Sequence, residues 1–345
     1  MRITNVKRLI AISLLCVFPM IAVGCNKTSQ QAYPDARIGI LYSTDSGNRS
    51  VMEWYDSELN TLGTDSYPFS GASVSQTNAH MQGDTVFLAP TGEEQKKDYG
   101  KIALINPTKG SFEEINTGRV NQYDCSVEGS YLALTSNLNG ACYVDLIQID
   151  NKEIRTLRIP DNRVICTQPI LINGEVFASA TDGDKYYLCQ CHFTDNEVAF
   201  ITELPDERST YLEKHGDDLA LISQGTLVKY NTVTKEWESI QLSHSDALNL
   251  NIVDDVAWIA YTDPFDENFH SSIEARNYQT GEVLCSEEFD GAILQLEADD
   301  DRLFVRTYEE LIAYSFANGQ LTEQRRIHCE KKGYYYSGFF YLGAK

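Results

Sequence analysis

The chain has 345 residues, of which 42% are hydrophobic, and its formal net charge is −22. This excess of acidic side chains favours solubility, and it disfavours nucleic acid and anionic lipid as partners because both are polyanions. We therefore expect a protein whose function does not depend on binding a negatively charged polymer or surface.

The first 24 residues are typical of a secretory signal. Arg2, Lys7 and Arg8 precede an apolar run from Leu9 to Gly24. A helix that spans a membrane needs about 20 apolar residues, and this run is shorter and contains Pro19. We predict that residues 1–24 direct export and are then removed, which would remove three positive charges and change the net charge from −22 to −25.

The end of this run resembles a bacterial lipobox. Ala22, Val23 and Gly24 lead into Cys25, although the first position is usually Leu. The resemblance implies cleavage before Cys25 and attachment of acyl chains such as palmitate, which bind a bilayer by burying CH₂ groups worth about 0.8 kcal/mol each. An ordinary signal peptide with an incidental cysteine is the alternative. Residues 25–36 are polar and lack hydrophobic periodicity, so we predict a lipidated Cys25 followed by a tether.

These features predict a protein held by lipid at the extracytoplasmic side of a cell membrane or an outer membrane. Seven further cysteines remain in the mature chain. Disulfides can form in that compartment, but the sequence does not show which cysteines would pair.

Residues 37–345 contain an internal repeat. Short acidic or glycine turns, each followed by an apolar run, recur roughly every 45 residues with one shorter step. The copies are QGDTVFL at 82, EGSYLAL at 128, NGEVFAS at 173, GDDLALI at 216, VDDVAWI at 253 and DDDRLFV at 299, with PDARIGIL at 34 as a seventh candidate. Continuous apolar runs of this length are typical of strands buried on both faces.

A second marker follows each copy, consisting of an amphipathic strand, a polar turn and another strand, as in EARNYQTGEVLCSEEF. The turns are rich in Asn, Asp and Gly, which tolerate left-handed backbone. Each unit therefore reads as four antiparallel strands, A to D along the chain. Seven such units resemble an all-β, seven-bladed β-propeller of the quinoprotein-like or lactonase-like superfamily, with six or eight blades as the alternative.

The two ends of the repeat predict how the ring closes. The first unit offers strands B, C and D but no A, and the chain ends with the aromatic segment GYYYSGFFYLGAK. We predict that residues 334–343 supply strand A of blade one, which would leave no free sheet edge at the junction.

The candidate binding site is the rim that carries the B-to-C and D-to-A connections, because these loops vary in length whereas the turns on the other rim are short and uniform. Plain surface loops are the alternative. The candidate rim residues are Asp98, Tyr99, Asp182, Asp184, Asp263, Phe265, Asp266 and His270.

Two groups of residues in the sequence are of types that can bind a metal ion. Asp182, Asp184, Asp263, Asp266 and Glu267 carry oxygen atoms of the kind that bind Ca²⁺, but they lie in two loops without calcium-loop spacing, so solvated acidic loops are the favoured interpretation.

In the sequence CQCH, strand alternation places the thiols of Cys189 and Cys191 on one face and His192 on the other. A zinc site would need a second pair of ligands, so packed core thiols are favoured and no cofactor is expected.

The sequence contains no Ser-His-Asp order and no nucleophile elbow, and only His244 and His270 fall on the candidate rim as bases. We therefore expect a monomeric, non-enzymatic lipoprotein that binds a protein, peptide or glycan. Two alternatives stay open: a scaffold for envelope assembly, and a lactonase-like or lyase-like enzyme with a metal in the central channel.

Overall fold

The computed structural model describes residues 28–44, 49–72, 80–90, 100–138, 140–161, 163–204, 212–223, 225–262, 270–299 and 301–343. The predicted signal segment and Cys25 lie outside these residues. The described part of the chain consists of strands and connections, and none of its segments forms a helix with the length and apolar character needed to cross a membrane.

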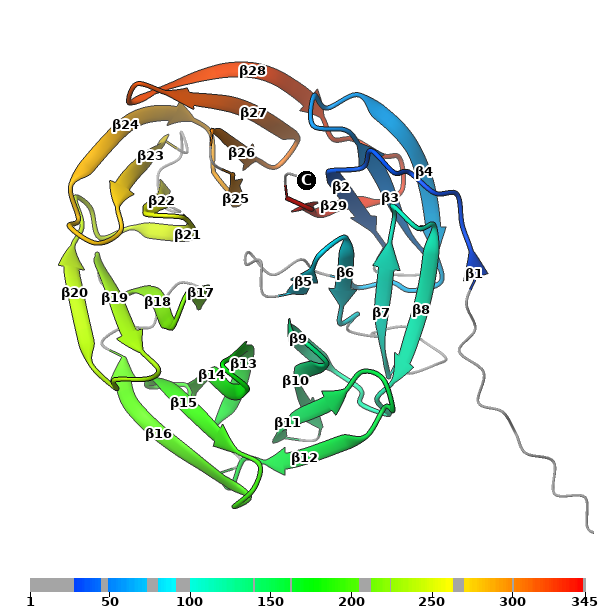
Figure 1. The fold of residues 1–345 in the computed structure, drawn as a ribbon, viewed down its shortest axis with the longest axis vertical. Helices are drawn as coiled ribbons and strands as arrows, with labels where there is room; N and C mark the ends of the chain where they lie inside the picture. Colours follow the sequence, from blue (N-terminus) through cyan, green and yellow to red (C-terminus); the bar gives the residue numbers. More distant parts are fainter. Residues whose placement is uncertain are drawn as a thin grey trace, which may run out of the picture.

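Seven antiparallel sheets stand in a ring around one axis, as Figure 1 shows. Blade 1 contains β29 (Tyr335–Tyr341), β2 (Ile38–Ser43), β3 (Ser50–Tyr55) and β4 (Thr61–Tyr67). Blade 2 contains β5 (Met81–Gln82), β6 (Thr85–Leu88), β7 (Lys101–Asn106) and β8 (Ser111–Asn116), with β1 (Thr28–Ser29) added outside β8. Blade 3 contains β9 (Gln122–Glu128), β10 (Tyr131–Leu138), β11 (Ala141–Gln148) and β12 (Ile154–Arg158).

The remaining four blades repeat the same order from the axis outward. Blade 4 contains β13 (Ile165–Ile172), β14 (Glu175–Thr181), β15 (Tyr186–His192) and β16 (Glu197–Leu204). Blade 5 contains β17 (Glu213–His215), β18 (Asp218–Ser223), β19 (Thr226–Asn231) and β20 (Trp237–Gln241). Blade 6 contains β21 (Ala247–Val253), β22 (Val256–Thr262), β23 (His270–Asn277) and β24 (Val283–Asp290). Blade 7 contains β25 (Gln295–Ala298), β26 (Arg302–Arg306), β27 (Glu310–Ala317) and β28 (Gln320–His328). The prediction of seven four-stranded blades is confirmed.

The turns form where the repeat predicted them. Between β13 and β14, Asn173 and Gly174 have φ angles of 53° and 75°. Two consecutive residues with positive φ make the kind of hairpin turn whose twist matches that of the strands, and Asn and Gly adopt it at little cost. The Asn-Gly pair therefore fixes the register in which Ile172 faces Glu175.

The hydrophobic core lies between blades rather than inside any one of them. One cluster, for example, joins Ile40 and Phe339 of blade 1 to Phe304 of blade 7. Trp54 and Trp258 are buried in such clusters, whereas Trp237 on the outer strand β20 is 40% exposed. Because each sheet needs its neighbours to bury both faces, we expect the blades of the closed ring to unfold together.

The C-terminal strand closes the ring as predicted. β29 pairs with β2, with Tyr341 opposite Ile38 and Phe339 opposite Ile40. Blade 7 also holds it, because Gln295 donates from Nε2 to the Phe339 carbonyl at 2.8 Å and accepts from the Phe339 amide at 3.2 Å. The pairing of β29 with β2 and the hydrogen bonds of the Gln295 side-chain amide therefore join the first and last blades.

The described part of the expected tether lies against the disc. β1 pairs with β8, the Gln30 amide donates to the Gly110 carbonyl at 2.9 Å, and the Tyr33 amide donates to the Pro107 carbonyl at 2.8 Å. The Tyr33 ring is buried in the cluster between blades 1 and 2. A Cβ at Gly63 would lie only 2.4 Å from that ring, so the missing side chain makes room for it.

Candidate functional site

The structure describes three of the eight residues predicted for the binding rim. Asp98, Tyr99, Asp263, Phe265 and Asp266, like Glu267, lie outside the described residues, so the prediction for them stays a prediction. Asp182 and Asp184 belong to the turn between β14 and β15 of blade 4, and His270 begins β23 of blade 6. Blade 5 separates these two positions, so the structure does not bring the three together (Figure 1).

The carboxylate of Asp182 accepts hydrogen bonds from its own turn and the strand that follows. Its Oδ1 accepts from the amides of Asp184 at 3.0 Å and Lys185 at 2.8 Å, and its Oδ2 accepts from the Tyr187 hydroxyl at 3.0 Å. These bonds, first those from the Lys185 and Asp184 amides, lower the pKa of Asp182. Both of its oxygens therefore have donors within the blade.

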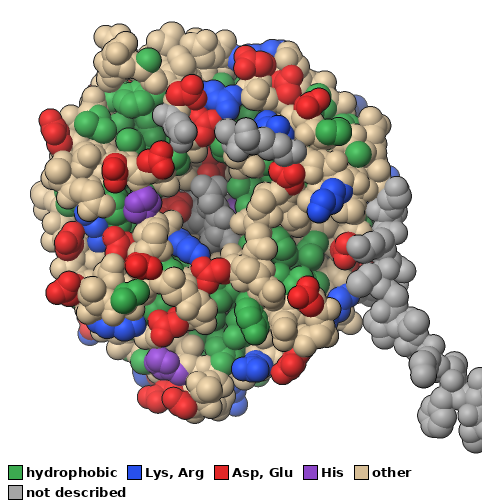
Figure 2. Space-filling view, in the orientation of Figure 1, with side chains coloured by type: hydrophobic (Ala, Val, Ile, Leu, Met, Phe, Trp, Pro, Cys, Tyr) green, Lys and Arg blue, Asp and Glu red, His purple; other side chains and the backbone are tan. Residues whose placement is uncertain are grey.

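Acidic side chains are spread over the face seen in Figure 2 rather than collected in one patch. Within the ranges that the structure describes, no three His, Cys, Asp or Glu side chains are placed to hold a metal ion. The predicted thiol packing is confirmed, because Cys189 and Cys191 belong to one buried cluster between blades 3 and 4.

Polar side chains on the innermost strands connect neighbouring blades around the axis. The Leu171 amide in blade 4 donates to Ser126 Oγ in blade 3 at 2.9 Å. In blade 6, Asn251 accepts from the Ala298 amide at 3.0 Å and donates to Glu297 Oε2 of blade 7 at 3.2 Å. These groups are buried, and their hydrogen bonds satisfy them across the blade boundaries.

Burial shifts the pKa values of two titratable groups near the axis in the direction that favours their neutral forms. Glu213 on β17 is 4% exposed, and its Oε1 has no hydrogen-bond partner in the described structure. Burial, and secondarily the charge of Glu297, raise the pKa of Glu213 well above its usual value. Burial lowers the pKa of His80 to about 4. The neutral forms of an acid and of an imidazole are therefore favoured among the innermost strands, where each group is enclosed by protein.

The raised pKa of Glu213 predicts a pH-dependent stability. The native chain keeps this proton at pH values at which the unfolded chain, with a pKa of about 4.3, has released it. The stability that the protonated group contributes is therefore complete below that pH and is lost as pH rises toward the raised pKa. We expect Glu213→Gln, which is neutral throughout, to be more stable than wild type by about 1 kcal/mol at pH 8.

Urea unfolding at pH 8 and pH 4.5 measures this difference, which should shrink at the lower pH. Glu288→Gln, at an exposed position on β24, is the matched control and should show no such dependence. Equal differences at both pH values would show that Glu213 is ionised in the native state.

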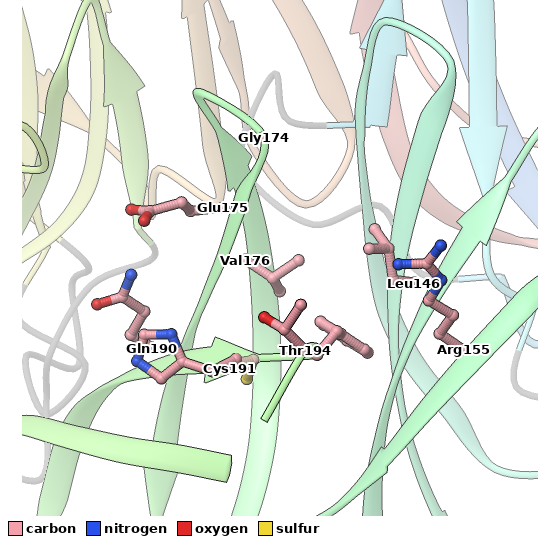
Figure 3. A pocket seen from close by; sticks show the side chains of 10 residues that line it. Leu146, Arg155, Gly174, Glu175, Val176, Gln190, Cys191 and Thr194 are labelled. Atoms are coloured by element: carbon pink, nitrogen blue, oxygen red, sulfur yellow. The ribbon is translucent and has the colours of Figure 1, made fainter. Parts of the chain in front are cut away.

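A pocket lies between blades 3 and 4 on the rim of the A-to-B and C-to-D turns, which is the rim opposite the predicted one. Its volume is about 230 Å³. Figure 3 shows the side chains that line it, which are Leu146 and Arg155 from blade 3 and Glu175, Val176, Gln190, Cys191, His192, Phe193 and Thr194, beside Gly174, from blade 4.

The charged groups of this pocket have partners, and its thiol is inactive as a nucleophile. Arg155 lies 3.7 Å from Glu153, and Glu175 lies 3.6 Å from Lys235. Burial raises the pKa of Cys191 to about 12, so the thiol keeps its proton at neutral pH. The pocket can hold a small group, but it lacks an activated nucleophile. No sequence pattern marks this pocket, because its walls come from strands and turns that look alike in every blade.

Neither a protein-family profile nor a curated protein sequence matches the chain. The similar solved structures include apo AztD from Citrobacter koseri, with a TM-score of 0.56, 10% identity and coverage of 88% of this chain and 97% of the other. A putative 6-phosphogluconolactonase from Bacteroides uniformis has a TM-score of 0.57 and 12% identity and covers 89% and 99%. A second one, from Bacteroides fragilis, has a TM-score of 0.56 and 12% identity and covers 88% and 98%.

These likenesses agree with the β-propeller fold that the repeat predicted. At 10–12% identity they show the fold alone. The same architecture carries proteins named for different roles, so the function of this chain has to be argued from its own residues.

Proposed function

We propose that the protein is a lipid-anchored, extracytoplasmic β-propeller that binds a protein, peptide or glycan on the rim formed by the B-to-C and D-to-A connections. The observation that carries this proposal is the exposure of aromatic rings on that rim. Tyr308, in the B-to-C turn of blade 7, is 61% exposed, and Tyr335, at the start of β29 in the adjoining blade 1, is 38% exposed. Exposed aromatic groups are enriched at the centres of binding interfaces.

The chemistry of the axis supports binding over catalysis. A propeller enzyme would need ionised carboxylates or a titrating imidazole that can reach a substrate. Burial raises the pKa of Glu213 and lowers that of His80 to about 4, which favours the neutral form of each, and both groups are buried among the innermost strands. Support for the anchor comes from the lipobox-like residues that end at Cys25.

Capture from solubilised membranes tests the proposed binding face. The bait is the mature chain, and the informative variant is Tyr308→Ser combined with Tyr335→Ser. Loss of two aromatic anchors should lower the yield of captured ligand at least about 10-fold, because each anchor at an interface contributes roughly 1 kcal/mol or more.

Trp237→Ser is the matched control, since Trp237 is a similarly exposed aromatic side chain on the outer strand of blade 5. It should capture as well as wild type. Equal loss in the control and the double variant, or no loss in either, would place the binding surface elsewhere.

A further inference from the structure

Arg306 differs from Arg119, Arg276 and Arg302 because no carboxylate of the described residues pairs with it. Arg119 lies 2.6 Å from Asp145, and Arg276 lies 2.8 Å from Glu274. Arg302, four residues before Arg306 on the same strand, lies 2.7 Å from Asp299. The contacts of Arg306 are instead to one peptide carbonyl and one aromatic ring.

The guanidinium of Arg306 is fixed in position by Tyr336. Its Nη2 donates to the Tyr336 carbonyl at 2.7 Å, and the group lies 4.4 Å from the centroid of the Tyr336 ring. Its Nε is buried, and no described residue accepts a hydrogen bond from it. Burial lowers the pKa of Arg306, although an arginine remains charged at neutral pH. Arg306 is therefore a cation that is fixed in position and partly desolvated, and some of its N–H groups make no hydrogen bond to the described residues.

Burying such a guanidinium destabilises the folded chain unless a hydrogen-bond acceptor or a negative charge pairs with it. A buried donor without a partner loses its hydration and gains no bond in return, and an unpaired buried charge adds to that cost. The whole chain carries a net charge of −22, so carboxylates that could have served as partners are abundant elsewhere. No carboxylate of the described residues pairs with Arg306, whereas the neighbouring Arg302 has one, so the guanidinium keeps donors for a partner that those residues do not supply.

The position of Arg306 makes it reachable. It is the last residue of β26, it remains partly exposed, and the B-to-C turn that follows it contains Tyr308. Tyr335, which precedes Tyr336 on β29, is the second exposed ring of the proposed binding rim. Arg306 therefore lies at the joint between blades 7 and 1, two residues before Tyr308 in the chain and bonded to the residue that follows Tyr335.

We propose that Arg306 is an oxyanion-binding residue that accepts a carboxylate or phosphate group. A planar guanidinium suits either group because its donors form a fork that matches two oxygens. The Tyr336 carbonyl and ring hold this fork in one orientation, so less conformational freedom is lost on binding. Combined with the proposed function, on which this last step rests, the rim ligand carries an acidic group.

Anion-dependent thermal unfolding of the full mature chain tests the site directly. The probes are inorganic phosphate and acetate, each replacing sodium chloride at constant ionic strength, so that the two arms separate the two oxyanion classes. We expect at least one probe to raise the unfolding midpoint by about 2 °C or more, because a ligand that binds only the native state stabilises it.

Three variants locate the effect. Arg306→Gln should abolish the shift, and Arg306→Lys should retain only part of it, because lysine keeps the charge but not the fork. Arg302→Gln is the matched control, on the same strand and already paired with Asp299, and it should keep the full shift. A wild-type midpoint that neither probe moves, or an unaltered shift in Arg306→Gln, would overturn the proposal.

A second measurement uses wild-type protein alone and so does not depend on how the variants fold. Crystals soaked in selenate should show an anomalous peak within hydrogen-bonding distance of the Arg306 guanidinium, and the lack of one there contradicts the proposal. Neither test requires the rim ligand. Failure of membrane capture would therefore contradict the proposed rim function but not the anion site. Failure of the anion tests would contradict the anion site but not the proposed rim function.

Discussion

Truncation before Tyr334 is expected to abolish cooperative unfolding of the propeller. The deletion removes β29, whose Phe339, Phe340 and Tyr341 are buried between blades. Each large aromatic side chain lost from a core costs about 3–5 kcal/mol, and the whole stability of a domain is commonly about 5–15 kcal/mol. The deletion also exposes the inner edge of β2, so aggregation should accompany the loss of stability.

A milder variant gives a graded result. Phe339→Ala keeps the strand pairing of β29 with β2 but removes one aromatic side chain from the boundary between blades 7 and 1. It should lower the free energy of unfolding by about 3–5 kcal/mol in urea titrations. Tyr308→Ala, at an exposed position, should change it by less than about 0.5 kcal/mol. A truncated chain that melts at the wild-type temperature would refute closure by β29.

The second large effect is expected from Cys25→Ala. If acyl chains on Cys25 hold the protein at the membrane, their loss removes the CH₂ groups that bind the bilayer, each worth about 0.8 kcal/mol. The variant should therefore lose incorporation of labelled palmitate, and the cleaved chain should move from the membrane fraction to the soluble fraction.

Both readouts are needed, because an uncleaved signal segment could retain the variant at the membrane without any acylation. Cys329→Ala, which alters a buried thiol in the disc, is the control and should keep the label. A cleaved Cys25→Ala chain that remains labelled and membrane-bound would place the anchor at another residue.

The fold was predictable because its signals are local and repeated. Each acidic or glycine turn before an apolar run marks one hairpin, and the missing strand of the first unit matches the extra aromatic strand at the end of the chain. Patterns of this kind depend on which side chains tolerate a turn or a buried strand. They require no knowledge of which blade lies beside which.

The contacts between blades were not predictable in the same way. Gln168 bonds to Leu212, and Gln295 to Phe339, in each case 44 residues further along the chain. A single polar residue in an apolar strand reveals its partner only once the ring is assembled. The same limit applies to Arg306, whose lack of a carboxylate can be seen only against its neighbours in space.

Tyr33 illustrates a third limit. The polar stretch around it has no periodicity and therefore reads as a tether, yet its ring fills the space left by Gly63. One aromatic side chain opposite one glycine makes no pattern in the sequence. The glycine and the ring are 30 positions apart, and their fit depends on the packing of blades 1 and 2.

The docking of β1 on β8 determines how a lipid-anchored disc could stand at a bilayer. Only three residue steps separate Cys25 from Thr28, and a fully extended chain spans at most about 3.6 Å per residue, so the lipid attachment point would lie within about 11 Å of the outer edge of blade 2. With so short a connection, the outer edge of blade 2 would lie against the bilayer, and the axis of the ring would run parallel to the membrane plane. Both rims would then face sideways along the membrane plane, open to ligands that approach along the surface.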